Sequence, residues 1–131
     1  MMKLLHTRIR VGDLERSIVF YCRHFGFYLK KRTERSPSGN RVALLELPGN
    51  AHLLELAWSA DYVLNVPEDL MHLAFGVPDL AAACQRLEHA GIKIWPKGWR
   101  EKFNSGKKMA FVDDPDGYEI EILEYRLSES G

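Results

Sequence analysis

The stretch Val11-Gly12-Asp13-Leu14 decides the fold, because it returns 66 residues later as Val77-Pro78-Asp79-Leu80. The same offset carries Leu54-Glu55-Leu56 onto Ile120-Glu121-Ile122, and two copies of a unit of that length account for essentially all 131 residues. Repeated units need repeated cores, which explains the apolar matches. A core has no use for a repeated glutamate. The repeat therefore predicts both a duplicated fold and a functional site.

Both halves have the same predicted order of elements, βαβββ. The first half opens with a strand over residues 3–11, followed by a helix that begins after Asp13 and ends at Gly26. Asp is favoured at helix N-caps and Gly at C-caps. Residues 60–69 are the candidate linker. The other predicted elements are strands over residues 27–32, 41–47, 53–59 and 70–77, a helix over 80–90, and strands over 92–96, 108–112 and 119–125.

These elements predict an α+β fold for a single domain, residues 1–131, made of two tandem βαβββ modules, residues 1–62 and 68–128. One such module cannot cover both faces of its own sheet, so two modules must pair, within a chain or between chains. We expect curved mixed sheets around a metal-binding cleft.

The composition is that of an ordinary globular protein, with 46% hydrophobic and 27% charged residues. Eighteen basic and eighteen acidic residues balance to a net charge of zero, which does not favour a nucleic-acid or membrane partner. No apolar run is long enough to span a membrane, and the N-terminus lacks the apolar segment of a signal peptide. We therefore expect a cytoplasmic protein in which Cys22 and Cys84 stay reduced and structural.

The repeated polar residues are predicted to point to one face of each sheet. Side chains alternate across a strand, so His6 and His72 point away from the apolar side chains that pack under the helices. By the same parity Glu55 and Glu121 point away from the apolar residues beside them. Two imidazoles and two carboxylates suit a divalent ion such as nickel, cobalt, zinc or manganese. We expect these four residues to bind one such ion, with room left for a substrate.

A plainer interpretation exists for each of these residues alone. A single His or Glu on a strand usually faces solvent or makes a hydrogen bond. Four such residues at one offset and one parity favour the metal site over that alternative. The other histidines, His24, His52 and His89, have no such partners and are predicted to be structural.

Two motifs resemble a known family. Leu4-Leu5-His6-Thr7 and Arg10-Val11-Gly12-Asp13-Leu14-Glu15-Arg16-Ser17-Ile18 resemble the start of bacterial glyoxalase I, or lactoylglutathione lyase, of the vicinal oxygen chelate superfamily. Phe111-Val112-Asp113-Asp114-Pro115-Asp116-Gly117-Tyr118-Glu119-Ile120-Glu121 resembles its closing signature. The resemblance implies a metal-dependent carbon–sulfur lyase of methylglyoxal detoxification. Such an enzyme isomerises the methylglyoxal–glutathione hemithioacetal to S-lactoylglutathione by proton transfer through an enediolate.

The resemblance also assigns roles by position. His6, Glu55, His72 and Glu121 match the family's four metal ligands. Glu121 matches the catalytic base, and Glu55 is its catalytic partner on the opposite side. Short bacterial members prefer nickel or cobalt over zinc, so Ni²⁺ is the first choice, with Co²⁺ or Zn²⁺ as alternatives. The resemblance further implies glutathione as co-substrate and a homodimer.

Three positions bear on how the thiol conjugate is bound. Arg10 matches a family arginine that holds a carboxylate of glutathione, the alternative being a surface salt bridge. Ser59 stands where the family usually has an Asn that contacts the peptide, and Glu68 stands where some members have an Arg. Residues 95–108 are rich in aromatic and basic side chains, which fits either a flexible lid or a solvated hairpin.

Two other functions compete with the lyase. One is another metal-dependent enzyme of the superfamily, such as an epimerase or a dioxygenase, in which the residue at the place of Glu55 is usually replaced. The other is a metal-free binding protein of the bleomycin-resistance kind. Trp58, Tyr62 and Trp99 would line its groove.

Overall fold

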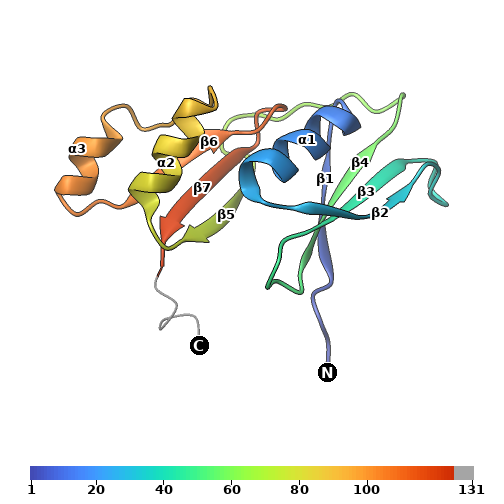
Figure 1. Cartoon of the computed structure of the whole chain (residues 1–131). Coiled ribbons are helices and arrows are strands. Elements are labelled where there is room, and N and C mark those ends of the chain that lie inside the picture. Colours follow the sequence, from blue (N-terminus) through green and yellow to red (C-terminus); the bar gives the residue numbers. More distant parts are fainter. Residues whose placement is uncertain (126–131) are drawn as a thin grey trace. The chain divides into compact units, whose positions relative to one another are not determined.

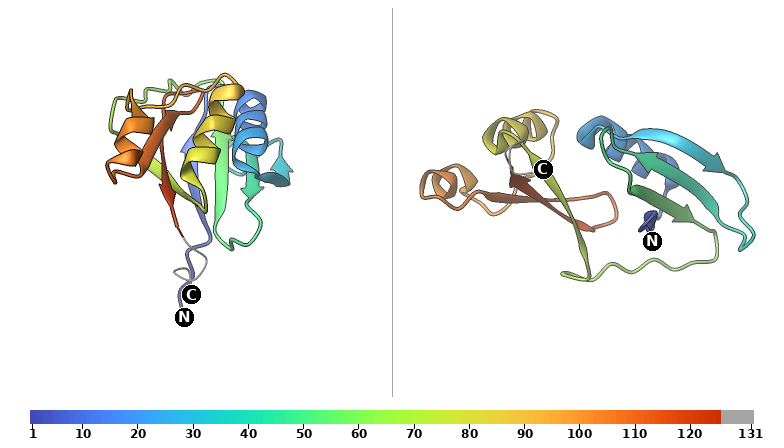
Figure 2. Two further views of the ribbon diagram at one scale, coloured as in Figure 1. Left: turned by 60° about the vertical axis from the view of Figure 1, so that its left-hand side comes forward. Right: turned by 90° about the horizontal axis from the view of Figure 1, so that it is seen from below.

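The computed structural model describes residues 1–125, and the chain divides into two compact units, Met1–Asn65 and Val66–Gly131. Each unit consists of a mixed sheet with helical segments (Figures 1 and 2). Within residues 1–125, no helix is long and apolar enough to cross a membrane. The predicted α+β class with mixed sheets is confirmed.

The first unit is a four-stranded sheet in the order β1-β4-β3-β2. Strands β1 and β4 pair in parallel, and the other neighbours are antiparallel. Helix α1 packs against β3, β4 and β2 (Figure 1). The elements are β1 (His6–Arg10), α1 (Leu14–Phe25), β2 (Tyr28–Thr33), β3 (Arg41–Glu46) and β4 (Leu53–Trp58).

Helix α1 begins and ends where the sequence predicts. The Asp13 side chain accepts a hydrogen bond from the Arg16 backbone N–H at 3.0 Å, which satisfies a donor of the first turn. Gly26 ends the helix in the left-handed conformation (φ 80°), and its N–H donates to the Tyr21 carbonyl. The helix buries a face of four residues against the sheet: Leu14, Ser17, Phe20 and Tyr21.

The second unit repeats this plan with a smaller sheet in the order β5-β7-β6. Strands β5 and β7 pair in parallel, β6 and β7 antiparallel. Helix α2 packs against β6 and β7 and is capped by Asp79, which accepts from the Ala82 N–H at 3.0 Å. The elements are β5 (His72–Val77), α2 (Leu80–His89), α3 (Trp99–Asn104), β6 (Met109–Asp113) and β7 (Glu119–Glu124).

The segment between α2 and β6 differs from the sequence prediction. Residues 92–96 form no strand, only one bridge between Trp95 and Phe111, so the predicted βαβββ order is wrong for the second unit. Pro96 has no N–H to continue a ladder. Gly98, in the left-handed region at φ 76°, then starts the unpredicted helix α3, which buries Trp99 and Phe103.

The turn between β6 and β7 is held by a buried carboxylate. Asp114 is only 4% exposed, and its Oδ1 accepts the backbone N–H groups of Asp116 at 2.8 Å and Tyr118 at 3.0 Å. Gly117 supplies the left-handed conformation that this turn requires (φ 95°). The turn fixes the antiparallel register, in which Phe111 pairs with Glu121.

Both cysteines are free thiols, as predicted. Burial raises the pKa of the Cys84 thiol to about 11, with the nearby Glu88 carboxylate adding to the effect. Burial also raises the pKa of Cys22. Only the thiolate is a strong nucleophile, so burial lowers the reactivity of both thiols.

Candidate functional site

In the first unit, the parallel pairing of β1 and β4 brings a histidine and a glutamate together. His6 Nε2 lies 3.6 Å from Glu55 Oε2. The two residues differ in exposure, with 44% of the His6 side chain and 10% of the Glu55 side chain accessible to solvent. A carboxylate this buried needs a partner, because removing a charge from water costs free energy.

The second unit builds the same pair from β5 and β7. His72 Nε2 lies 3.5 Å from Glu121 Oε1, with side-chain exposures of 44% and 18%. Within residues 1–125, no group of three or more His, Cys, Asp or Glu side chains gathers closely enough to hold a metal ion. Each unit therefore offers two of the four residues that the sequence predicts as ligands.

The donor atoms of both pairs fit a divalent transition-metal ion. Bonds of about 2.0–2.2 Å from nitrogen and carboxylate oxygen place neighbouring ligand atoms roughly 3.0–3.5 Å apart. The observed separations of 3.6 Å and 3.5 Å are close to that range. Imidazole nitrogen with carboxylate oxygen is a donor set that nickel, cobalt and zinc accept.

The glutamates of the two pairs differ in one hydrogen-bond partner. Arg8 lies directly opposite Glu55 in the ladder and donates its Nε–H to Glu55 Oε1. In the second unit the residue opposite Glu121 is Ala74. Sequence reasoning gave Arg8 no role, although its position two residues after His6 puts it on the same face of the strand.

Arg10 is held by three neighbours in the first unit. Its Nη1 donates to Asn40 Oδ1 at 2.7 Å, its Nη2 donates to Ser59 Oγ at 2.5 Å, and its guanidinium lies 4.1 Å from the centroid of the Tyr62 ring. The two predicted substrate-binding residues, Arg10 and Ser59, therefore contact each other. Asn40 was missed by sequence reasoning because it lies in a loop, where no periodic pattern singles it out.

A cavity of about 510 Å³ lies beside His72 in the second unit. One wall is aromatic, because the rings of Trp95 and Phe111 stack with centroids 4.4 Å apart. His72 meets the same Phe111 ring edge-on at 6.5 Å. Besides His72, three acidic residues line the cavity: Glu68, Asp69 and Glu119. Glu68, where some family members have an arginine, thus lies close to a predicted ligand.

Comparison with known proteins identifies the family. A model of the Glyoxalase/Bleomycin resistance protein/Dioxygenase superfamily matches residues 3–122. The chain belongs to this superfamily. The resemblance predicted from the sequence is thereby confirmed.

Relatives within the superfamily share the full length of the chain. The lactoylglutathione lyase of Haemophilus influenzae is 33% identical over 133 residues, covering 99% of this chain and 98% of that enzyme. The enzyme of the same name from Salmonella typhimurium is 34% identical, with 99% and 98% covered. This similarity shows that the chain is a lyase of the glyoxalase I type.

Solved structures agree with this placement. The trypanothione-dependent glyoxalase I of Leishmania major superposes with a TM-score of 0.79 at 29% identity, covering 99% of this chain and 91% of that one. TnmS3, an antibiotic binding protein from Streptomyces sp. CB03234, has a TM-score of 0.71 at 22% identity and 96% and 98% coverage. At that identity TnmS3 shows the shared superfamily fold alone.

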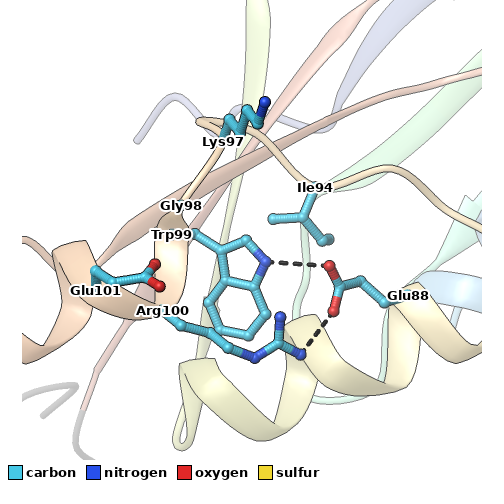
Figure 3. Close-up of a pocket in the computed structure, with 7 residues that line it drawn as sticks. All are labelled: Glu88, Ile94, Lys97, Gly98, Trp99, Arg100 and Glu101. Atoms are coloured by element: carbon cyan, nitrogen blue, oxygen red, sulfur yellow. Dashed lines mark hydrogen bonds and ion pairs between the residues drawn. The ribbon is translucent and has the colours of Figure 1, made fainter.

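Trp99, predicted to line a drug groove in a binding protein of the superfamily, is only 4% exposed and lines a pocket of the second unit. Figure 3 shows the Arg100 side chain running alongside its indole, and the guanidinium lies 4.2 Å from the ring centroid. Trp99 Nε1 donates to Glu88 Oε2 at 3.2 Å, and Arg100 Nη2 donates to Glu88 Oε1 at 2.8 Å. These contacts, here called the Glu88 clamp, tie α3 to α2. The adjoining pocket measures about 280 Å³.

The Glu88 clamp should loosen in acid. The hydrogen bonds from Trp99 and Arg100 lower the pKa of Glu88 below its ordinary value of 4.5. The clamp therefore stabilises the folded chain above that value, and this contribution is lost as the pH falls through the lowered pKa. We expect a change in tryptophan fluorescence as the pH falls below 4.5, the ordinary pKa of a glutamate, and Glu88→Gln should remove this change. Glu101→Gln, in the same pocket wall, is the control and should keep the change.

Proposed function

We propose that the chain is a metal-dependent lactoylglutathione lyase that isomerises the hemithioacetal of methylglyoxal and glutathione to S-lactoylglutathione. The observation that carries the proposal is the His–Glu pair in each unit, with donor atoms 3.6 Å and 3.5 Å apart. Full-length similarity to enzymes of that name supports it independently.

His6, Glu55, His72 and Glu121 are the proposed ligands of one divalent ion, with Ni²⁺ as first choice and Co²⁺ or Zn²⁺ as alternatives. Two carboxylates balance the charge of such an ion, which makes a partly buried site tolerable. When bound, the ion stabilises the negative charge that develops on oxygen as a carbon-bound proton leaves.

Glu121 is the proposed base. It takes the proton from the carbon that carries the sulfur and returns it to the neighbouring carbonyl carbon, while a second proton moves between the two oxygens. The product therefore contains the same atoms as the substrate. The side chain of Glu121 is 18% exposed, against 10% for Glu55, so it has the better access to a substrate. Glu55 is the proposed partner on the opposite side.

Arg10 is the proposed contact for a carboxylate of the thiol peptide, since a guanidinium fork matches a carboxylate. Asn40 and Ser59 fix its orientation through hydrogen bonds of 2.7 Å and 2.5 Å. A side chain held in this way loses less conformational entropy when it binds a ligand. The homodimer and the cytoplasmic location stay predictions from the sequence.

Metal reconstitution tests the proposal. The protein is stripped with a chelator and given Ni²⁺, Co²⁺ or Zn²⁺ separately, and isomerisation of the methylglyoxal–glutathione hemithioacetal is followed. We expect one ion per site and turnover that is restored by metal and lost again on chelation. The trypanothione hemithioacetal is assayed in parallel, because the Leishmania relative is trypanothione-dependent. Stoichiometric metal binding without turnover of either conjugate would reject the proposed isomerisation activity and leave the superfamily assignment intact.

A further inference from the structure

The two carboxylate oxygens of Glu55 have different neighbours. Its Oε1 accepts the Nε–H of Arg8, and its Oε2 faces His6 Nε2 at 3.6 Å. Both neighbours come from β1, two residues apart, so they lie on the same face of the sheet. The hydrogen bond from Arg8 thus occupies one oxygen and leaves the other directed at the histidine.

The duplicated unit lacks this arrangement. Glu121 Oε1 faces His72 at 3.5 Å, but the residue opposite Glu121 in the ladder is Ala74, whose methyl group cannot donate a hydrogen bond. The two His–Glu pairs are therefore alike in spacing and unlike in the partners of their carboxylates. The observed difference between the two carboxylates is the hydrogen bond that Glu55 accepts from Arg8.

We propose that Arg8 is a positioning residue that makes Glu55 a one-oxygen ligand of the metal ion. The inference rests on the proposed function for the presence of the ion. Its basis in this chain is that Glu55 Oε1 is occupied by a charged donor while Oε2 points to His6.

Two physical effects support this role. Hydrogen bonds from outer residues orient a ligating carboxylate, and their loss typically weakens metal binding by about 10- to 100-fold. A charged donor also forms a stronger bond than a neutral one, and the Glu55 side chain that accepts this bond is only 10% exposed. Arg8 itself is 41% exposed, so the guanidinium can be replaced without opening the core.

Cobalt provides the test, because the visible absorption of bound Co²⁺ responds to coordination number. Apoprotein is titrated with Co²⁺ in competition with a chelator for wild type, Arg8→Met and Arg8→Lys. For Arg8→Met we expect about tenfold weaker Co²⁺ binding and an altered absorption spectrum, as Glu55 gains a second oxygen contact. Arg8→Lys retains a charged donor and should restore part of the affinity. Arg35→Met removes an exposed arginine from the same unit and should match wild type.

The outcomes separate the inference from the function on which it rests. Arg8→Met with wild-type Co²⁺ affinity and spectrum, or with tighter binding, would overturn the positioning role while metal-dependent turnover of the wild type still stood. A wild-type protein that binds no Co²⁺ would overturn both. Thermal denaturation of each apoprotein shows that the variants are folded, so weaker binding cannot be attributed to unfolding.

Discussion

Replacing Glu121 by Gln is expected to lower kcat for hemithioacetal isomerisation by about 10²- to 10⁴-fold, the usual contribution of a positioned base. An amide cannot take up the carbon-bound proton, although its oxygen still faces His72. The change should therefore appear in kcat more than in KM. Steady-state kinetics of the metal-loaded variant provides the measurement, with metal content determined on the same samples.

Glu124→Gln is the matched control for this substitution. It lies on the same strand as Glu121, three residues later and hence on the opposite face, and it accepts hydrogen bonds from the Leu80 N–H and from Lys108. Its amide oxygen can still accept from Leu80, so activity should stay close to wild type. Full activity in metal-loaded Glu121→Gln would exclude Glu121 as the base.

Replacing Tyr21 by Ala should lower the free energy of unfolding by about 3–5 kcal/mol, the range for deleting a large buried aromatic side chain. Tyr21 is fully buried under the first sheet and meets the rings of Phe20 and Phe27 edge-on, with centroids 5.1 Å and 5.9 Å apart. Domains of this size are stable by only about 5–15 kcal/mol. The variant should therefore be partly unfolded or unfold at low denaturant.

Chemical denaturation at fixed pH measures this effect, and the same helix supplies the control. Val19 is 49% exposed on α1, so Val19→Ala should change the free energy of unfolding by less than about 0.5 kcal/mol. If Tyr21→Ala cost no more than Val19→Ala, the packing of α1 on the first sheet would not contribute to stability as described.

Local chemistry made much of the fold predictable. Helix α1 begins at Asp13 and ends at Gly26 because capping depends on the residue itself and its nearest backbone groups. The segment before β6 was mispredicted for the opposite reason. Ile94 and Trp95 follow the pattern of a strand, but the structure has only one bridge at Trp95. The short helix that follows, which buries Trp99 and Phe103, depends on packing that the sequence pattern does not show.

The candidate site was predictable in its residues but not in their grouping. A single offset and strand parity predicted that His6, Glu55, His72 and Glu121 point to one face of each sheet, since parity follows from backbone geometry alone. The structure brings them together as two pairs, one in each unit. The hydrogen bond from Arg8 to Glu55 and the contact of Asn40 with Arg10 depend on side-chain conformations across separate elements. No periodicity in the sequence encodes these contacts.

The face on which Glu121 lies depends on the turn held by Asp114, a residue with no proposed part in the reaction. Side chains on a strand alternate with a period of two, so a register slip by one residue would send Glu121 to the helix side and expose Ile120 in its place. An insertion in this turn would therefore move Glu121 to the other face of the sheet altogether, rather than displace it by a small distance. Tolerance to length change at this loop should be far lower than at an ordinary surface hairpin.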